Sequence, residues 1–411
     1  MEPKQINYKE ENKMGKSCIR ECFEKGKGIF HLKPTWVPRS FGKPGYRLRL
    51  HPDDYFAFGM NRGAICERWL GSVTVALNGP ETKEDEGMSY VLDEGNESFL
   101  LKDAIEELGL DIIGKGLQQK YGTWPTFSKF FDYSTPLFHH LHLEESKANL
   151  INRHGKPEAY YFPIQLNNTL GRFPVTYFGF DPDTDPEDVK DCIRNYDKFD
   201  TRITELSRAY RIKLGTGWYT PAGVIHAPGS VLTYEPQWNS DVNTIMENVT
   251  MDEVNGHNLL TDCCPEDKKD DVDYLFSQID WEQSTEVHYK EKYFREPKEI
   301  PSTQKGLVEK WVAYANEFVA AKEVVVAPGT KIILKDEACY CAVLTQGYGK
   351  LGEYDCEVAV MLRYDQASGD EFFVSEKAAK DGVVIENKSK YENLVILQNF
   401  ANNNEAVPKI K

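Results

Sequence analysis

Short runs of apolar and aromatic residues, broken by proline and glycine, recur along most of this 411-residue chain. In the first half they begin near residue 31, and in the second half they begin at Glu323 and return roughly every eight to twelve residues. Alternating runs of this length separated by turn residues are typical of antiparallel strands, and their regular spacing favours a barrel or a sandwich. We therefore expect a mainly β fold, with second-half strands at 324–334, 341–349, 357–362, 371–374, 382–385 and 393–397.

Three segments have a helical rather than a strand pattern. Residues 99–119 carry apolar side chains at helical spacing. A second helix is predicted to start at Asp185, because aspartate is a favoured N-cap and Pro186 suits the first helical position. A third helix is expected from Leu307 to Phe318.

Polar and proline-containing stretches suggest how the chain is divided. We expect residues 1–280 to form a first domain with an N-terminal extension and helical insertions, 281–304 to form a linker, and 305–411 to form a second β-rich domain. The second domain contains no histidine, so a histidine metal site is not expected there. The acidic, glycine-containing stretch 80–96 is predicted to be an exposed loop, and residues 1–30 to be an arm or a first helix.

Charge and composition narrow the classes of partner. The formal net charge of -16 argues against binding to nucleic acid or to an anionic membrane, since both need a basic surface. No apolar stretch approaches the roughly 20 residues that span a bilayer, and the N-terminus lacks the apolar core of a signal peptide. We expect a cytoplasmic protein whose nine cysteines are free thiols.

The candidate chemistry lies between residues 136 and 241. His140 and His142 are two residues apart, so in a strand both side chains leave the same face. Glu158 follows after a turn, and His226 comes later, directly behind a Pro-Ala-Gly turn. Three imidazoles and one carboxylate inside a barrel would hold a divalent metal and leave positions open for a substrate. The alternative is four unrelated polar residues on half-buried strands.

These segments also carry a family resemblance. In order they read Pro-Leu-Phe-His-His-Leu-His from Pro136, Gly-Lys-Pro-Glu from Gly155, Pro-Ala-Gly-Val-Ile-His from Pro221, and Glu-Pro-Gln-Trp-Asn-Ser-Asp from Glu235. Their order and spacing resemble the phosphomannose isomerase (mannose-6-phosphate isomerase) family of the cupin superfamily, over roughly residues 60–250. The resemblance implies two cupin-type barrels, also called jelly rolls or double-stranded β-helices, with inserted helices.

The same resemblance implies an activity and a cofactor. It indicates a metal-dependent isomerase that converts an aldose into a ketose, free or phosphorylated, through a metal-stabilised enediol. One divalent ion is expected, with zinc favoured and manganese, iron or nickel able to accept the same ligands. The partner would be a small sugar or sugar phosphate, and a homodimer is compatible with this fold.

Two positions depart from the family pattern. His140 stands where the family usually has a glutamine ligand, which keeps a metal-binding side chain. Ile245 stands where the family usually has an arginine, and an apolar side chain cannot replace a guanidinium in holding a phosphate or an oxygen.

Further site residues follow from strand geometry and from the resemblance. Lys156 lies two residues before Glu158, so both side chains leave the same face of a strand. Lys156 and Glu235 are the candidate catalytic acid and base. Their alternatives are an exposed turn lysine and a buried carboxylate that only orients a ligand. Candidate substrate-binding residues are Tyr160, Trp218 and Gln237, although aromatic residues on barrel strands also form cores.

Two other functions fit the same ligands. Three histidines and a glutamate in a cupin also suit Fe(II), so an oxygenase is an alternative. A non-catalytic bicupin that binds metal or sugar is another, because Ile245 replaces the family arginine. Metal analysis combined with activity measurements would separate the three.

Overall fold

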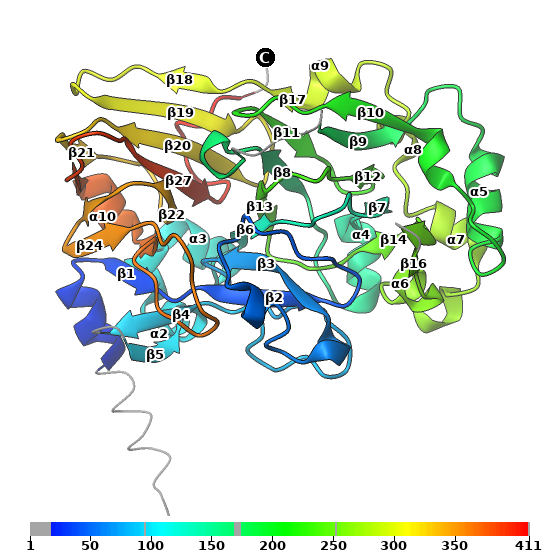
Figure 1. The fold of residues 1–411 in the computed structure, drawn as a ribbon, viewed down its shortest axis with the longest axis horizontal. Coiled ribbons are helices and arrows are strands. Elements are labelled where there is room, and N and C mark those ends of the chain that lie inside the picture. Colours follow the sequence, from blue (N-terminus) through cyan, green and yellow to red (C-terminus); the bar gives the residue numbers. More distant parts are fainter. Residues whose placement is uncertain (1–17, 94–95, 168–173, 251–252, 410–411) are drawn as a thin grey trace, which may run out of the picture.

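A computed structural model of the protein describes residues 18–93, 96–167, 174–250 and 253–409. Strands arranged in sheets make up most of it, and short helices lie at the edges (Figure 1). The prediction of a mainly β protein is confirmed. A closed barrel is not found among the described strands, so the arrangement as two barrels stays a prediction.

The largest sheet has nine strands and joins distant parts of the chain. Strand β1 pairs with β25 on one side and with β4 on the other. The order across the sheet is β18 (Lys298–Ile300), β19 (Leu307–Ala313), β20 (Ala320–Val326), β27 (Leu394–Phe400), β22 (Tyr340–Gln346), β25 (Glu371–Val374), β1 (Ile29–Leu32), β4 (Tyr90–Asp93) and β5 (Asn96–Leu100).

A four-stranded sheet packs on the C-terminal half of this large sheet. Val324 and Ile396 of the large sheet share one buried core with Ile332 and Ile385 of the small one. The small sheet runs in the order β21 (Lys331–Leu334), β26 (Val383–Asn387), β23 (Tyr348–Leu351) and β24 (Tyr354–Glu357).

Two further sheets face each other and enclose the segments with candidate chemistry. Tyr160 on one sheet and Phe178 on the other meet in a shared core, with ring centroids 5.9 Å apart. The seven-stranded sheet runs β17 (Phe294–Arg295), β11 (Gly217–Thr220), β8 (Glu158–Tyr161), β13 (Thr233–Trp238), β6 (Thr126–Phe131), β3 (Ala64–Leu70) and β2 (Thr35–Arg39). The five-stranded sheet runs β10 (Ser207–Arg211), β9 (Val175–Phe180), β12 (His226–Ala227), β7 (His140–Leu141) and β14 (Thr244–Ile245). A separate two-stranded sheet pairs β15 (Val249–Thr250) with β16 (Glu253–Val254).

Helices are short and peripheral, and α5 and α7 lie at the right-hand end in Figure 1. Residues 18–25 are helical. The α-helices are α2 (Leu101–Ile112), α3 (Gly114–Tyr121), α4 (Glu145–Ala148), α5 (Pro186–Arg194), α6 (His257–Thr261), α7 (Val272–Phe276), α8 (Trp281–Ser284), α9 (Tyr289–Tyr293) and α10 (Glu376–Asp381). The 3₁₀-helices are η1 (Pro52–Asp54), η2 (Met60–Arg62), η3 (Asn149–Ile151), η4 (Ile164–Leu166), η5 (Ile203–Leu206) and η6 (Glu266–Lys268).

Two of the predicted helices are confirmed and the third is wrong. Residues 99–119 contain most of α2 and α3, and the Asp185 side chain caps α5 by accepting a hydrogen bond from the Glu187 amide. The stretch predicted as a helix from Leu307 to Phe318 instead contains β19, which pairs with β18 and β20 on its two sides. Inter-strand hydrogen bonds on both edges outweigh a weak local helical preference.

Two surface predictions also need correction. Of the strand predicted at 357–362, only Glu357 lies in a strand, because β24 ends at that residue. Val360 beyond it is 89% exposed. The stretch 80–96 is not a single exposed loop, because it contains β4 and the buried Glu86, which forms an ion pair with Arg62.

The proposed division of the chain at 281–304 stays a prediction. That stretch contains α8, α9, β17 and β18.

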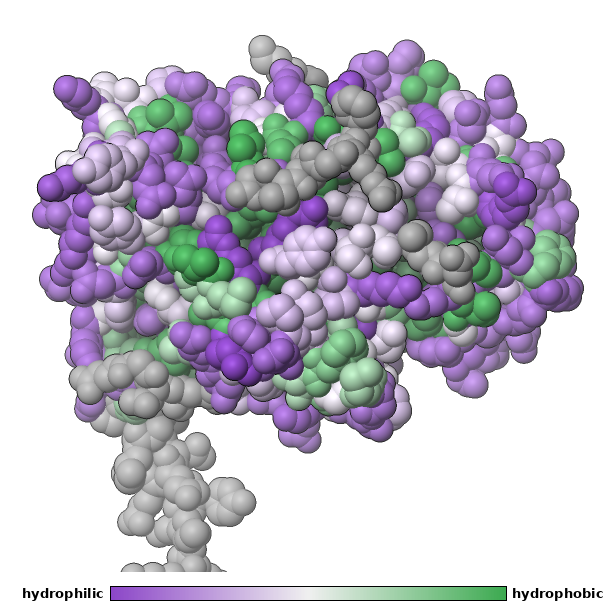
Figure 2. Space-filling model, viewed as in Figure 1, coloured by the Kyte–Doolittle hydropathy of each residue, from purple (hydrophilic) through white to green (hydrophobic). Residues whose placement is uncertain are grey.

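Polar side chains dominate the face seen in Figure 2, and apolar residues gather there only in separate small groups. Within the described ranges, no helix combines the length and the apolar character needed to cross a membrane.

Candidate metal centre

Strand pairing brings three histidines together. His140 on β7 lies directly opposite His226 on β12, and His142 shares the face of His140 because strand side chains alternate. All three rings are buried, with centroids 4.3 Å apart for His140 and His226 and about 5 Å apart for the other two pairs. One ring nitrogen from each lies within 4.8 Å of the others, so the trio could hold a metal ion.

Each ring is held in the tautomer that a metal requires. The Nδ1 atom of every ring lies within hydrogen-bonding distance of a backbone carbonyl oxygen, which can only accept. The proton is therefore on Nδ1, and the lone pair of Nε2 faces the centre. The Nδ1 to oxygen distances are 3.0 Å for His140 with Phe138, 2.8 Å for His142 with Val242, and 2.8 Å for His226 with Val224.

Glu158 on β8 faces these lone pairs from the opposite sheet. Its Oε2 lies 3.0 Å from Nε2 of His142, and its Oε1 lies 3.2 Å from Nε2 of His226. Oε1 of Glu158 and Nε2 of His226 both lack a hydrogen-bond partner, although both atoms are buried. Burial lowers the pKa of His142 to about 4 despite the attraction of Glu158, and burial also lowers that of His140, so these rings are neutral.

Acceptors that face one another without a proton need a cation between them. The donor set of neutral imidazole and carboxylate is the one that zinc and related divalent metals accept. The geometry therefore fits a metal. The role of Glu158 as a fourth ligand stays a prediction.

Lys156 lies beside this centre and is buried. The alternative interpretation of Lys156 as an exposed lysine in a turn is therefore excluded. Its Nζ is 2.5 Å from Oε2 of Glu158, 2.8 Å from Nε2 of His142 and 3.2 Å from Oε1 of Glu235. Burial opposes ionisation of Glu158, but its interactions with His142 and with Lys156 outweigh burial and hold its pKa well below the usual range. Lys156 thus helps to keep Glu158 ionised.

Glu235 on β13 is the second titratable group beside Lys156. Its Oε1 accepts from Nζ of Lys156 and lies 3.1 Å from Nζ of Lys129. Burial and the neighbouring charge of Glu158 raise the pKa of Glu235 to about 8, although both lysines oppose the shift. The buried carboxyl group is consequently able to gain and lose a proton near neutral pH.

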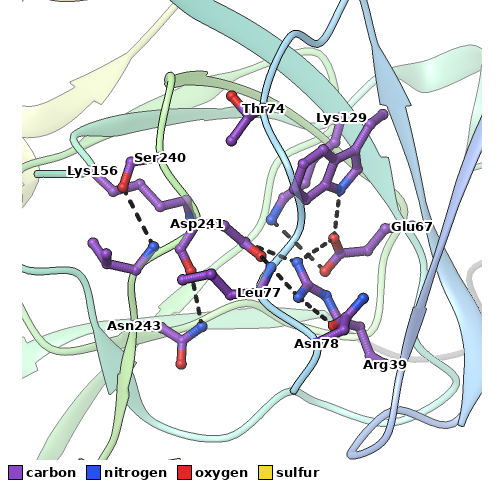
Figure 3. A network of polar contacts seen from close by, with 12 residues as sticks. Arg39, Glu67, Thr74, Leu77, Asn78, Lys129, Lys156, Ser240, Asp241 and Asn243 are labelled. Atoms are coloured by element: carbon purple, nitrogen blue, oxygen red, sulfur yellow. Dashed lines mark hydrogen bonds and ion pairs between the residues drawn. The ribbon is translucent and has the colours of Figure 1, made fainter. Parts of the chain in front are cut away.

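A network of charges that the sequence did not predict forms the opposite wall (Figure 3). Arg39 on β2 donates to both carboxylate oxygens of Asp241, at 2.9 and 3.1 Å, and to Glu67 on β3, at 2.9 Å. Glu67 also accepts from the Trp69 indole, and its Oε1 lies 3.8 Å from Nζ of Lys129. The stretches around Glu67 and Lys129 resemble early strands of the isomerase family, but no sequence signal marks Arg39.

These groups line a small cavity that is partly open to the surface. Its volume is about 30 Å³, which is room for about two water molecules. The apolar part of the lining comes from Phe41, Phe131, Leu137, Phe138, Tyr160 and Pro228, and the polar part from Arg39, Glu67, Lys129, Tyr133, His140, His142, Lys156, Glu235, Asp241 and Asn243.

The predicted substrate-binding residues differ in position. Tyr160 lines the cavity. Gln237 is buried and donates to the Ser240 carbonyl, and Trp218 packs against Phe178 with ring centroids 4.9 Å apart. Neither Gln237 nor Trp218 is among the described residues that line the cavity, so no cavity contact supports their predicted role.

Position 245 brings no positive charge to the centre. Ile245 on β14 pairs with His140 and is completely buried. The guanidinium group at this cavity comes from Arg39, which lies on a different strand of the facing sheet.

Comparisons with known proteins place the fold. No protein-family model matches the sequence, and no curated protein sequence matches it. Solved structures do match: mannose 6-phosphate isomerase from Bacillus subtilis is 16% identical, with 91% of this chain and 99% of that chain covered and a TM-score of 0.60. A variant of phosphomannose isomerase from Salmonella typhimurium is 11% identical, with 91% and 100% covered and a TM-score of 0.60.

A third match is a mannose 6-phosphate isomerase bound with zinc and yttrium, at 12% identity, with 90% and 99% covered and a TM-score of 0.59. At these identities the likeness concerns the fold. The chain therefore has the cupin fold of phosphomannose isomerases, and the resemblance seen in the sequence is confirmed at that level.

Proposed function

We propose that this protein is a metal-dependent isomerase of a small sugar. The observation that carries the proposal is the cluster of His140, His142 and His226 with Glu158, placed within reach of Lys156 and Glu235. Aldose–ketose conversion needs a Lewis acid and a group that moves a proton between adjacent carbons, and both are available here. The shared fold of the mannose 6-phosphate isomerases supports this class of reaction.

The metal ligands in this proposal are His140, His142, His226 and Glu158. Zinc suits this set best, and manganese, iron and nickel can also accept it. The bound ion would supply Lewis-acid stabilisation of negative charge on the substrate oxygens. The Nδ1–H bonds to backbone carbonyls hold the rings in place, which keeps the lone pairs aimed at one point.

Lys156 and Glu235 are proposed to handle the proton. Oε1 of Glu235 accepts from Lys156 and faces Lys129, so in its neutral form the carboxyl carries its proton on Oε2. That oxygen is then the exchangeable site, and a raised pKa suits both protonation and deprotonation near pH 8. Lys156 stabilises the ionised form of Glu235 and the ionised form of Glu158.

The experiment is elemental analysis of the purified protein followed by a screen of free and phosphorylated aldoses. We expect one divalent ion per chain and conversion of at least one aldose. Replacing Lys156 with methionine should lower turnover roughly 100- to 10,000-fold, the usual contribution of a catalytic acid or base. A metal-loaded protein that converts no aldose or ketose would refute the proposal.

Lys322→Met is the matched control. Lys322 is an equally buried lysine, and it forms ion pairs with Glu309 at 2.9 Å and Asp336 at 2.6 Å in the large sheet. Its replacement should affect stability but leave turnover per folded molecule unchanged. Equal losses of turnover in both variants would show that Lys156 acts only through the fold.

An Fe(II) oxygenase is the second candidate. The specific observation in its favour is a cavity of about 30 Å³ with apolar residues in its wall, which admits a diatomic gas more readily than a hexose. Iron found in the purified protein, together with oxygen uptake on addition of an organic substrate, would favour this reading over the isomerase.

The finer architecture belongs to the same proposal. We retain two cupin-type barrels, with a metal-binding unit at 1–280 and a unit without metal ligands at 305–411. Limited proteolysis of the full chain tests this, since cleavage confined to 281–304 that leaves two folded pieces would support the division.

A further inference from the structure

Three residues form the mouth of the cavity beside the histidines. All of the described residues that line this cavity are buried except Phe41, Leu137 and Asn243, which also reach the solvent. The cavity volume of about 30 Å³ is far below the roughly 300 Å³ of an ordinary site for a small organic ligand. A sugar therefore reaches the metal ligands only when part of the mouth moves.

Phe41 belongs to residues 40–45, here called the strap, which follow β2 directly. Its ring packs edge-on against the ring of Phe138, with centroids 4.8 Å apart. Within the described chain, residues 40–42 make one backbone hydrogen bond, from the Gly42 amide to the Arg39 carbonyl at 3.2 Å. Phe41 is thus held at the mouth mainly by the packing of its ring.

The far end of the strap is tied to the segment that follows β6. The Ser134 amide donates to the Lys43 carbonyl, and the Gly45 amide donates to the Asp132 carbonyl, both at 2.9 Å. Nζ of Lys43 also lies 2.8 Å from Glu253, in an exposed ion pair that contributes little stability. A segment that is fixed at both ends and loosely held between them is suited to local opening.

Close packing beneath the strap marks the described position as a closed one. A Cβ atom at position 42 would lie 2.7 Å from Sγ of Cys66 and 2.7 Å from the ring of Tyr133, so only glycine fits there without a shift of these neighbours. The strap backbone therefore covers Cys66, which is completely buried. Opening of the strap would uncover this thiol together with the mouth of the cavity.

We propose that the strap is a lid over the metal centre and that the Phe41 ring closes the mouth. The strap moves away from Cys66 and Phe138 to admit a ligand of sugar size, and it returns to exclude water from the reaction. This deepens the proposed function, on which it rests for the metal and for the size of the ligand. It adds the residues that control access to the site.

Thiol labelling of the full chain as purified tests the lid without any ligand. The protein is treated with N-ethylmaleimide, and each cysteine is followed separately by peptide mass analysis, relative to its rate in the unfolded chain. We expect Cys66 to react at least tenfold faster than Cys339, which is equally buried but belongs to a different core. Equal rates would mean that only global unfolding exposes Cys66, and they would overturn the inference.

Gly42→Cys provides a way to lock the lid. The short distance to Cys66 brings the two Cβ atoms within the roughly 4.5 Å that a disulfide bridges. Oxidised glutathione forms this bond, a phosphine reductant breaks it, and both reagents are removed before the measurement. We expect EDTA to remove zinc from the zinc-loaded variant at least tenfold more slowly in the oxidised form than in the reduced form. Equal rates in a protein that carries the 42–66 disulfide would overturn the lid.

Gly42→Ser is the matched control. Its side chain is similar in size to that of cysteine but cannot form the bond, so its rate of zinc loss should not depend on the redox treatment. Should Gly42→Cys fail to fold, Phe41→Ala is the second variant, with zinc loss at least tenfold faster than in Phe58→Ala. Phe58 is also partly exposed and packs edge-on against Tyr364 at 5.4 Å, but it is not among the described residues that line this cavity.

Equal zinc loss in Phe41→Ala and Phe58→Ala would also overturn the inference. The proposed function is tested separately, because labelling of Cys66 needs neither metal nor substrate. Fast labelling of Cys66 without turnover of any aldose would leave the lid standing and remove the isomerase. Turnover of an aldose with equal labelling of Cys66 and Cys339 would do the reverse.

Discussion

Two buried clusters of charge in this molecule look alike in composition and differ in how their polar atoms are satisfied. One is the candidate metal cavity around Glu158, here called the metal cavity. The other, here called the Arg68 cluster, consists of Arg68 on β3 with Asp370 and Glu371 at β25. Arg68 donates to both oxygens of Asp370, at 2.7 and 2.9 Å, and to Glu371 at 3.1 Å.

Every carboxylate oxygen of the Arg68 cluster has a donor. The second oxygen of Glu371 accepts from the Gly71 amide at 3.0 Å, and the Ser368 hydroxyl donates to Asp370 at 2.5 Å. In the metal cavity, by contrast, Oε1 of Glu158 and Nε2 of His226 face each other without a proton. The difference teaches that buried charge alone does not mark a site, and that the two clusters are separated by the facing acceptors of Glu158 and His226.

The Arg68 cluster has a structural position. Arg68 belongs to the seven-stranded sheet, and Glu371 belongs to the nine-stranded sheet, so their ion pair joins the two. Paired charges at such a junction fix how the sheets meet, although a paired buried charge adds little net stability by itself.

The largest expected effect is on stability, at the Arg68 cluster. Arg68→Met leaves Asp370 and Glu371 buried without their counter-charge, which should lower the free energy of unfolding by about 3–5 kcal/mol. Urea unfolding measures this, and the zinc content of the folded variant should not change. Arg363→Met is the control, because the Arg363 side chain that pairs with Asp54 is exposed and the pair should contribute less than about 1 kcal/mol. A loss of zinc in Arg68→Met would mean that the Arg68 cluster and the metal cavity are coupled and not independent.

The next effect is on metal binding, at the other cluster. His226→Ala removes a buried ligand and should weaken zinc binding by at least about 100-fold, or about 2.8 kcal/mol, because changes even to groups behind the ligands cost 10- to 100-fold. Chelator should therefore lower the melting temperature of the natural protein but not of the variant. His257→Ala, at a partly exposed histidine paired with Asp197, should keep full zinc content. An unchanged zinc content in His226→Ala would mean that the metal binds at another site.

The sequence was sufficient to predict that the three histidines come together. Strand periodicity alone places His140 with His142, and Lys156 with Glu158, on shared faces. The turn before His226 marks the return of the chain to the same sheet, and the pairing of His226 with His140 confirms that return. Local geometry of this kind can be read directly from spacing.

The opposite wall could not be predicted in the same way. Arg39 binds Asp241 across 202 residues of chain, and nothing near Arg39 in the sequence indicates that contact. The error at β19 has the same origin, since its two neighbouring strands decide its conformation. Both depend on long-range pairing, which neither composition nor periodicity contains.

The smallest effect is a difference in pH dependence within the Arg68 cluster. Burial raises the pKa of Glu371 to about 7 although Arg68 opposes the shift, whereas the attraction of Arg68 outweighs burial for Asp370 and lowers its pKa. A carboxyl whose pKa is raised by folding contributes stability that is fully present below its ordinary pKa of 4.5 and is lost as the pH rises through 7.

Glu371→Gln removes that titration. Between about pH 4.5 and 7, the stability of the natural protein should therefore fall relative to that of the variant, by at most about 1.4 kcal/mol per pH unit. Urea unfolding at several pH values measures the slope. Asp370→Asn should show no such slope in this range, because the contribution of a carboxyl with a lowered pKa is lost only as the pH falls further. Equal slopes for the two variants would mean that Arg68 does not distinguish its two partners, and that the cluster titrates as one group.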